Sequence, residues 1–218
     1  MLHKSFSSAW YGHGPYLDMW YRGTPIVKCP LDLFMYQEIV WRTKPDLIVE
    51  TGTYAGGSAV FLADQLDLMN QHESQPDGAR VISIDLNAGT DLPEHPRISW
   101  VEGWSSVDLR TLEYVEKAVS KADRVMVILD SDHSQPHVLK ELNAYHLFVS
   151  PGCYLIVEDT NEDAYAAMDA QGYDPLVGFA NHAVKSWKPE RHGFKVDERC
   201  ERFLFTQNPG GYLRKDSA

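Results

Sequence analysis

The sequence of 218 residues has little cysteine and no long apolar run. Its three cysteines are odd in number and none forms a Cys-x-x-Cys pair: Cys29, Cys153 and Cys200. This argues against a disulfide framework and against a thiolate zinc site. No stretch approaches the roughly 18 apolar residues of a membrane-spanning helix, and the N-terminus lacks the apolar core of a signal peptide. We therefore expect no membrane span and a cytoplasmic location.

Positive charge is also scarce, since 20 Lys and Arg face 31 Asp and Glu, for a formal net charge of −11. Proteins that bind nucleic acid displace counterions with concentrated Lys and Arg, and no dense run of either occurs here. We expect no nucleic-acid partner. The length and an apolar content of 44% suit one α/β domain with a large core, and we expect residues 1–218 to form a single domain.

Short apolar segments that end in an acidic residue recur along the chain and predict strands. They lie at 47–50, 81–85, 125–130 and 154–158, with a weaker candidate at 98–102. Helical segments alternate with them, at 31–43, 58–69, 107–121 and 136–148. This alternation predicts a Rossmann-like, doubly wound, mostly parallel sheet covered on both faces. We expect 194–197 and 202–206 to close the sheet as an antiparallel pair.

The first 45 residues precede the predicted Rossmann-like core of 46–218. The early part is rich in aromatic rings that favour burial: Trp10, Tyr11, Tyr16, Trp20 and Tyr21. We expect 1–45 to form an aromatic N-terminal arm and a helix that pack over the core. Residues 160–195 show no clear period and are predicted to be irregular and to face the substrate.

The most informative motif runs from Asp46 to Ser58 and reads Asp-Leu-Ile-Val-Glu-Thr-Gly-Thr-Tyr-Ala-Gly-Gly-Ser. A strand that ends in Glu50 is followed by a glycine turn and a helix, the order found in a nucleotide-type cofactor pocket. Glycine lets the backbone approach a ligand without a Cβ atom, and the helix start offers free N–H groups. The carboxylate favours a ligand with a positive charge or hydroxyls over a phosphate on this turn.

Asp85 ends the second predicted strand, where an acid in nucleoside-binding sheets accepts hydrogen bonds from ribose hydroxyls. The glycine pattern is Glu-x-Gly-x-x-x-Gly and differs from the Gly-x-Gly-x-x-Gly of dinucleotide-binding proteins. The difference favours S-adenosylmethionine, whose sulfonium and amino-acid end suit a carboxylate-lined turn. Trp104 and Ser105 follow the weaker strand and could lie against an adenine, although Trp104 fits the core equally well.

The densest group of acids follows two later strands, as Asp130-Ser-Asp132-His133 and Glu158-Asp159. Neighbouring strands lie about 5 Å apart, so these carboxylates would converge if the two strands are neighbours. Like charges so close raise each other's pKa unless a cation neutralises them, and all-oxygen ligands suit Mg²⁺ ahead of Ca²⁺ or Mn²⁺. The spacing leaves open whether Asp130 or Asp132 is the direct ligand. The alternative is that these acids cap loops and pair with Arg or Lys.

His133 lies one residue beyond Asp132. Histidine side chains titrate near neutral pH, which suits a general base that takes the proton of an acceptor hydroxyl. A histidine that only packs or caps a loop is the alternative. Lys28, just before the first predicted core helix, could reach the same place from the arm, although a surface position is the commoner one for lysine.

Together these motifs resemble class I S-adenosylmethionine-dependent methyltransferases, and more narrowly the family named after a cephalosporin hydroxylase, which includes rhamnosyl O-methyltransferases. The resemblance covers nearly the whole chain, in segments that begin at Lys28, Lys44, Leu129, Val149 and Phe205. It implies Mg²⁺ at an acid of Asp130-Ser-Asp132 together with Glu158 and Asp159, and His133 as the base. We expect cofactor contacts from these residues: Glu50, Thr51, Gly52, Thr53, Gly56, Gly57, Ser58, Asp85, Ser105 and Asp130.

The sequence thus predicts a Mg²⁺-dependent, S-adenosylmethionine-dependent O-methyltransferase that acts on a hydroxyl of a sugar or a small secondary metabolite. A homo-oligomer is compatible with this prediction. Two alternatives stay open at this point. One is a nicotinamide-dependent oxidoreductase, which the glycine pattern disfavours, and the other is a non-catalytic partner subunit of an antibiotic-tailoring hydroxylase or methyltransferase system.

Overall fold

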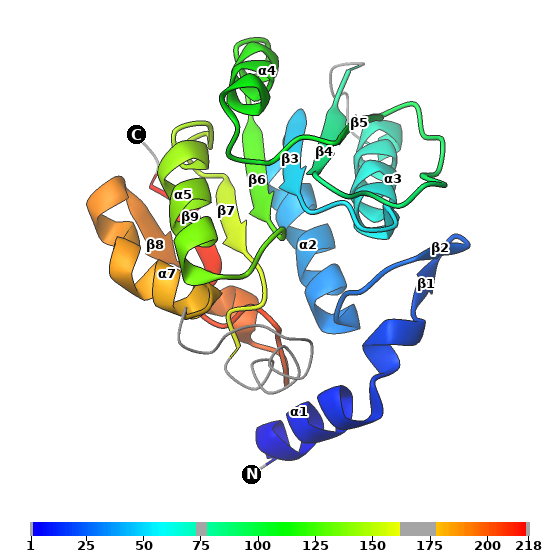
Figure 1. Ribbon diagram of the computed structural model, residues 1–218, viewed down its shortest axis with the longest axis vertical. Helices are drawn as coiled ribbons and strands as arrows, with labels where there is room; N and C mark the ends of the chain where they lie inside the picture. The colour runs from blue at the N-terminus through cyan, green and yellow to red at the C-terminus, as the bar shows by residue number, and fades with distance from the viewer. Residues whose placement is uncertain (1, 73–77, 162–177, 217–218) are drawn as a thin grey trace.

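The centre of the protein is a seven-stranded sheet with the order β5-β4-β3-β6-β7-β9-β8 (Figure 1). The computed structural model describes residues 2–72, 78–161 and 178–216. The strands are β3 (Leu47–Thr51), β4 (Arg80–Asp85), β5 (Ile98–Glu102), β6 (Val125–Leu129), β7 (Tyr154–Val157), β8 (Phe194–Val196) and β9 (Tyr212–Lys215). The first five pair in parallel, and β9 runs antiparallel to both of its neighbours. The predicted Rossmann-like, mostly parallel sheet is confirmed.

Helices cover both faces of the sheet. They are α2 (Pro30–Thr43) and α3 (Gly57–His72) on one face, and α4 (Leu109–Val119), α5 (Gln135–Tyr145) and α7 (Ala180–Trp187) on the other. Strand residues alternate between the two cores: Val125, Val127 and Leu129 pack with α4, α5 and α7, whereas Met126 and Ile128 pack with α2 and α3. This two-sided burial explains why the strands read as continuous apolar runs.

The N-terminal arm consists of α1 (Leu2–His13), the 3₁₀ turn η1 (Pro15–Asp18) and a small hairpin of β1 (Trp20–Tyr21) and β2 (Thr24–Pro25). It lies at the end of the molecule toward which β6 and β7 point (Figure 1). Trp10 is buried against Phe205, with ring centroids 6.2 Å apart. Trp20, however, is 63% exposed, so the expected burial of the aromatic residues holds for only part of the arm.

The prediction of a strand at 202–206 is wrong. The chain there follows a 3₁₀ turn, η4 (Glu198–Glu201). Its side chains contact the arm and α2, since Phe205 joins the aromatic cluster around Trp10 and the Thr206 hydroxyl donates a hydrogen bond to Asp32. The strand that pairs with β8 is β9, at Tyr212–Lys215. Its Tyr212 and Leu213 point into opposite cores, which is what a strand covered on both sides requires.

The expectation of an irregular segment at 160–195 is wrong in part. The described portion contains α7 and the 3₁₀ turn η3 (Pro189–His192), and α7 packs its Ala183 and Trp187 into the core. Residues 162–177 of that segment lie outside the described residues. Among the described residues, the chain forms no helix that is both long and apolar enough to span a bilayer.

Candidate active site

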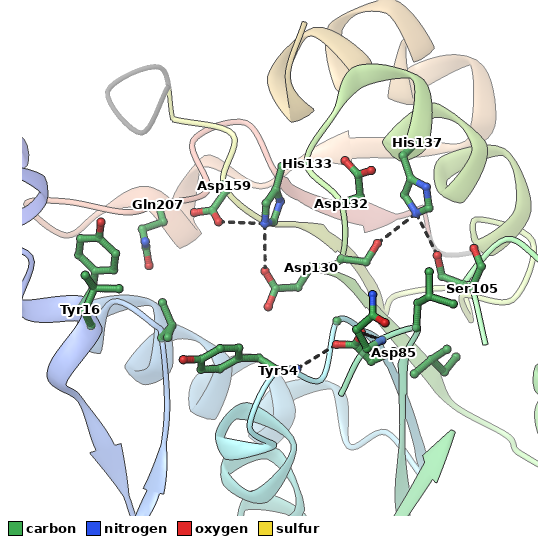
Figure 2. A pocket seen from close by; sticks show the side chains of 18 of the residues that line it. Tyr16, Tyr54, Asp85, Ser105, Asp130, Asp132, His133, His137, Asp159 and Gln207 are labelled. Atoms are coloured by element: carbon green, nitrogen blue, oxygen red, sulfur yellow. Dashed lines mark hydrogen bonds and ion pairs between the residues drawn. The ribbon is translucent and has the colours of Figure 1, made fainter. Parts of the chain in front are cut away.

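A cavity of about 710 Å³ opens at the carboxyl edge of the sheet, where parallel α/β sheets bind ligands. Each of the five parallel strands supplies at least one lining residue at or just beyond its end, among them Gly52, Asp85, Ser105, Asp130 and Asp159. Figure 2 shows that Asp130, after β6, and Asp159, after β7, point toward His133. Asp85 lies at a distance from this group. The sheet topology thus gathers residues that are more than a hundred positions apart.

Asp130, His133 and Asp159 form a compact group on this wall. His133 Nε2 lies 3.2 Å from Asp159 Oδ2 and 3.9 Å from Asp130 Oδ1 (Figure 2), and one ligand atom from each residue lies within 4.8 Å of the others. The group forms because β6 and β7 pair with Leu129 opposite Val157. Burial raises the pKa of Asp159, and the nearby His133 opposes that rise.

Lys28 lies on the buried side of the same group. A surface position is the commoner one for lysine, so the sequence favoured exposure over this contact. Its ammonium binds Asp130 Oδ2 and lies 2.7 Å from Glu158 Oε2, and the side chain is almost fully buried. Burial raises the pKa of Asp130, and Lys28 opposes that rise.

Glu158, whose role as a metal ligand stays a prediction, lies on the buried side of the group next to Lys28. Its second oxygen, Oε1, accepts a hydrogen bond of 2.7 Å from the Tyr36 hydroxyl. Both oxygens are therefore engaged on the buried side, and the lining of the cavity formed by the described residues includes Asp159 but not Glu158. Burial and the neighbouring Asp130 raise the pKa of Glu158. In this arrangement Lys28 and Tyr36 satisfy the carboxylate that we expected to bind Mg²⁺.

Asp132 lines the cavity but does not join the group around His133. Its Oδ1 accepts a hydrogen bond of 2.8 Å from the backbone N–H of Ser134, the residue that caps α5. Although burial opposes the change, the hydrogen bonds from Ser134 hold the pKa of Asp132 below its usual value. Between the two alternatives left open by the spacing, the geometry favours Asp130 as the acid that faces a metal.

The glycine turn after β3 has two separate roles. Gly52 lines the cavity with a φ of +87°, and a Cβ atom there would lie 1.9 Å from the carbonyl oxygen of Asp130. Cβ atoms at Gly56 and Gly57 would instead meet Trp100 and the Pro25 carbonyl. These two glycines let the turn pack against its protein neighbours, and, within the described part of the chain, they do not line the cavity.

Four other predicted cofactor residues also lie off the cavity wall that the described residues form: Glu50, Thr51, Thr53 and Ser58. Glu50 is fully buried, and its Oε2 accepts a hydrogen bond of 2.7 Å from Ser83. Its Oε1 has no hydrogen-bond partner among the described residues. Burial, opposed by Lys28, raises the pKa of Glu50 to about 7.

Asp85 organises the turn and also lines the cavity. Its Oδ2 accepts backbone hydrogen bonds from Thr53 and Tyr54 at 2.8 and 3.0 Å, and Oδ1 accepts one from Asn87 at 2.8 Å. A carboxylate has about four acceptor positions, so these bonds leave capacity for ligand hydroxyls. The structure thus places Asp85, Gly52, Ser105 and Asp130 at the cavity, as predicted for contacts to a cofactor.

A polar network that was not predicted lies at the start of α5. His137 lines the cavity, and its Nε2 lies 3.0 Å from Ser106 Oγ, 3.2 Å from Ser131 Oγ and 3.5 Å from Glu141 Oε1. The sequence signal for this network is a glutamate four residues after a histidine, on a helix face that is otherwise apolar. All three partners lie on one ring nitrogen, so this is not the acid–histidine–serine relay of hydrolases, which uses both nitrogens.

The residues present fit both expected groups. The carboxylates of Asp130 and Asp159 suit Mg²⁺, which prefers oxygen ligands, whereas zinc prefers thiolates or several histidines. The Gly52 cradle and the remaining acceptor capacity of Asp85 suit a ligand with hydroxyls that lies close to the backbone.

The strand order, with one antiparallel strand next to the end, and the acid–glycine turn after β3 define the class I methyltransferase fold. A dinucleotide-binding Rossmann sheet instead has six strands in the order 3-2-1-4-5-6 and a Gly-x-Gly-x-x-Gly turn. The sequence pattern of the rhamnosyl O-methyltransferase/CmcI family matches residues 15–216, and the chain belongs to this family.

Curated relatives agree with the family. The rhamnosyl O-methyltransferase of Mycobacterium tuberculosis is 32% identical over 216 residues, covering 96% of this chain and 83% of the relative. That of Mycobacterium leprae is 28% identical over 214 residues, covering 96% and 89%.

Solved structures agree with the fold. An apo-structure of CmcI has a TM-score of 0.68 at 22% identity, covering 93% of this chain and 78% of that one. CmcI with Mg and SAM has a TM-score of 0.65 at 20% identity, covering 92% and 78%. MycE methyltransferase, with Mg and SAH, has a TM-score of 0.54 at 15% identity, covering 98% and 54%.

Proposed function

We propose that this chain is a Mg²⁺-dependent, S-adenosylmethionine-dependent O-methyltransferase that acts on a hydroxyl of a sugar or a small metabolite. The observation that carries the proposal is the meeting of Asp130, His133 and Asp159 on the wall of a cavity that Gly52 and Asp85 also line. Relatives named rhamnosyl O-methyltransferase support a sugar acceptor. The CmcI structure with Mg and SAM supports the two bound groups.

The cofactor end of the cavity is the side with Gly52, Asp85 and Ser105. S-adenosylmethionine, when bound, supplies a methyl group activated by the positive sulfonium. Asp85 would accept hydrogen bonds from the ribose hydroxyls, and Gly52 would let the cofactor lie directly against the backbone.

The acceptor end is the side with His133. Mg²⁺, when bound by Asp130 and Asp159, supplies a positive charge that positions an acceptor hydroxyl and lowers its pKa. His133 would take the hydroxyl proton. The Asp159 carboxylate, 3.2 Å from its Nε2, would stabilise the positive charge of the imidazolium that forms. The remaining gain comes from holding two reactants in one cavity.

The test uses the purified chain with S-adenosylmethionine, Mg²⁺ and a panel of rhamnosides, other glycosides and catechols, and it measures S-adenosylhomocysteine. We expect transfer to a sugar hydroxyl that stops in EDTA. His133→Ala should lower kcat about a hundredfold or more, because a positioned base contributes on that scale, while the Kd for S-adenosylmethionine stays the same. The matched control is His72→Ala, at the exposed end of α3, which should not change kcat.

Other outcomes would contradict parts of the proposal. Transfer that persists in EDTA would remove the metal, and an unaltered pH–rate profile of His133→Ala would remove the base. Binding of S-adenosylmethionine without transfer to any acceptor would favour the partner-subunit alternative, and binding of a nicotinamide dinucleotide in its place would favour the oxidoreductase. A homo-oligomer, a cytoplasmic location and the absence of a nucleic-acid partner remain predictions.

A further inference from the structure

One buried charge takes no part in the chemistry proposed above. Lys28 lies between β2 and α2 and is 3% exposed. The segment is anchored on both sides of it, because Val27 lines the cavity and the Cys29 N–H donates a hydrogen bond of 2.8 Å to Gln207 Oε1. Pro30 then begins α2. The arm therefore carries a lysine across the carboxyl edge of the sheet into its interior.

The surroundings of Lys28 are strongly negative. Four carboxylates from three adjacent strands meet here: Glu50, Asp130, Glu158 and Asp159. Buried carboxylates at these distances repel one another, and the cost of their desolvation is offset only by a well-placed opposite charge. In the described part of the chain, Lys28 is the lysine or arginine that contacts Asp130 and Glu158.

The contacts of Lys28 divide the acid group into two sides. The ammonium binds Asp130 Oδ2 and Glu158 Oε2, whereas Asp130 Oδ1 faces His133 and Asp159. Tyr36 holds the other Glu158 oxygen. Asp130 is thus fixed from behind, with one oxygen presented to the cavity.

We infer that Lys28 is the built-in cation that keeps the acid group assembled before a metal arrives. It is a positioning residue, since it acts through Asp130 and Glu158 and does not line the cavity. The protein then folds with a complete acid group in the absence of metal. Without Lys28, a divalent cation has to supply the missing positive charge, so the fold becomes dependent on metal.

The experiment compares Tm in EDTA and in 5 to 10 mM Mg²⁺ for the wild type, K28M and the control K195M (concentrations of this order saturate ordinary Mg²⁺ sites). Lys195 forms an exposed ion pair with Asp216, and such pairs contribute little to stability. We expect K28M to lose about 10 °C in EDTA, which is the scale for a broken buried ion pair in a chain of this size. Mg²⁺ should restore about half of that loss in K28M, a larger gain in Tm than the wild type and K195M show on binding the same ion.

Two results would overturn the inference: a K28M Tm in EDTA within about 2 °C of the wild type, or a gain from Mg²⁺ no larger in K28M than in the wild type. If K28M does not fold, E158Q and K28M/E158Q carry the same test, because Asp130 still needs a counter-charge. The double variant must gain more Tm from Mg²⁺ than E158Q does, and equal gains would overturn the inference.

The identity of the ion rests on the proposed function, and a separate measurement isolates that part. Calorimetric titration of the wild type with Mg²⁺ alone shows whether the proposed metal binds. If it does not bind, the metal assignment fails, whereas the EDTA comparison still decides whether Lys28 holds the acid group together.

Discussion

At the scale of one residue, Glu50 is a buried acid whose ionisation destabilises the folded protein. The side chain is fully buried, one oxygen lacks a hydrogen-bond partner among the described residues, and burial raises the pKa from 4.5 to about 7. Below pH 4.5 the folded and unfolded chains both hold the proton, so the ionisation of Glu50 does not affect stability. Between pH 4.5 and 7 only the folded chain holds it, so stability falls as pH rises.

The Glu50→Gln variant tests this effect. Above pH 7 the ionised carboxylate costs about 3 kcal/mol of the free energy of unfolding, and glutamine removes that cost while keeping an acceptor for Ser83. We expect the Tm of the variant in EDTA to exceed that of the wild type at pH 8.5 and the two to converge toward pH 5. A difference in Tm that is constant between those pH values would show that Glu50 is not the titrating group.

At the scale of one residue, the sequence predicted which side chains reach the cavity better than it predicted which of them meet. Asp85, Asp130, His133 and Asp159 reach the cavity because each follows a strand that the apolar pattern identifies. Glu158 follows the same pattern, yet its oxygens are held by Lys28 and Tyr36. Both partners come from more than a hundred residues away, and no local pattern indicates that contact.

The turn between β3 and α3 brings the backbone at Gly52 to the wall of the cavity. At Gly52 the backbone is left-handed and the carbonyl of Asp130 occupies the space of a Cβ atom. At Gly103, after β5, the backbone is also left-handed, with φ +73°, but a Cβ atom would meet no atom within 4 Å. A side chain at Gly103 would therefore cause backbone strain alone, whereas a side chain at Gly52 would cause backbone strain and a steric overlap.

Replacing each of these glycines by alanine gives a matched pair of variants. Gly103→Ala should lower the free energy of unfolding by about 1 kcal/mol, the cost of a left-handed alanine. Gly52→Ala should lower it by about 3 kcal/mol or more, since β3 and β6 must also separate locally. Denaturant unfolding measures both, and equal losses would show that the turn relaxes without disturbing Asp130.

At the scale of elements, the five parallel strands and helices α2 to α5 were predictable because their apolar periods are local properties of the chain. The closing strand was misplaced because 202–206 is mostly apolar, whereas half of the residues of β9 are basic. Packing overrides this pattern, since Phe205 joins the arm cluster, whereas Tyr212 and Leu213 extend the sheet.

On the scale of the whole molecule, Asp32 joins α2 to the C-terminal segment. Its carboxylate accepts hydrogen bonds from the Thr206 hydroxyl, the Gln207 N–H and the Tyr212 hydroxyl. Gln207 in turn accepts from the Cys29 N–H, next to Lys28. The last strand, the arm and the acid group are thus connected through one buried carboxylate, whose pKa burial raises to about 6.

Asp32→Ala should therefore destabilise the molecule as a whole. Three buried donors would lose their acceptor, and we expect a loss of about 3 kcal/mol, reduced somewhat because the buried charge also disappears. The measurement is denaturant unfolding together with the rate at which a protease cleaves within residues 1–30, which should rise. Asp216→Ala, which removes an exposed partner of Lys195, is the control and should change neither value by much.

The sequence by itself determined the class of sheet, the glycine turn and the acidic strand ends, because apolar period and the special backbone of glycine are written in consecutive residues. Only the tertiary structure decided which acids share a wall, which carboxylate is neutralised by Lys28 and where the sheet closes. Those outcomes depend on Coulomb interactions and packing between distant segments, whose strength is set by distances that no sequence spacing contains.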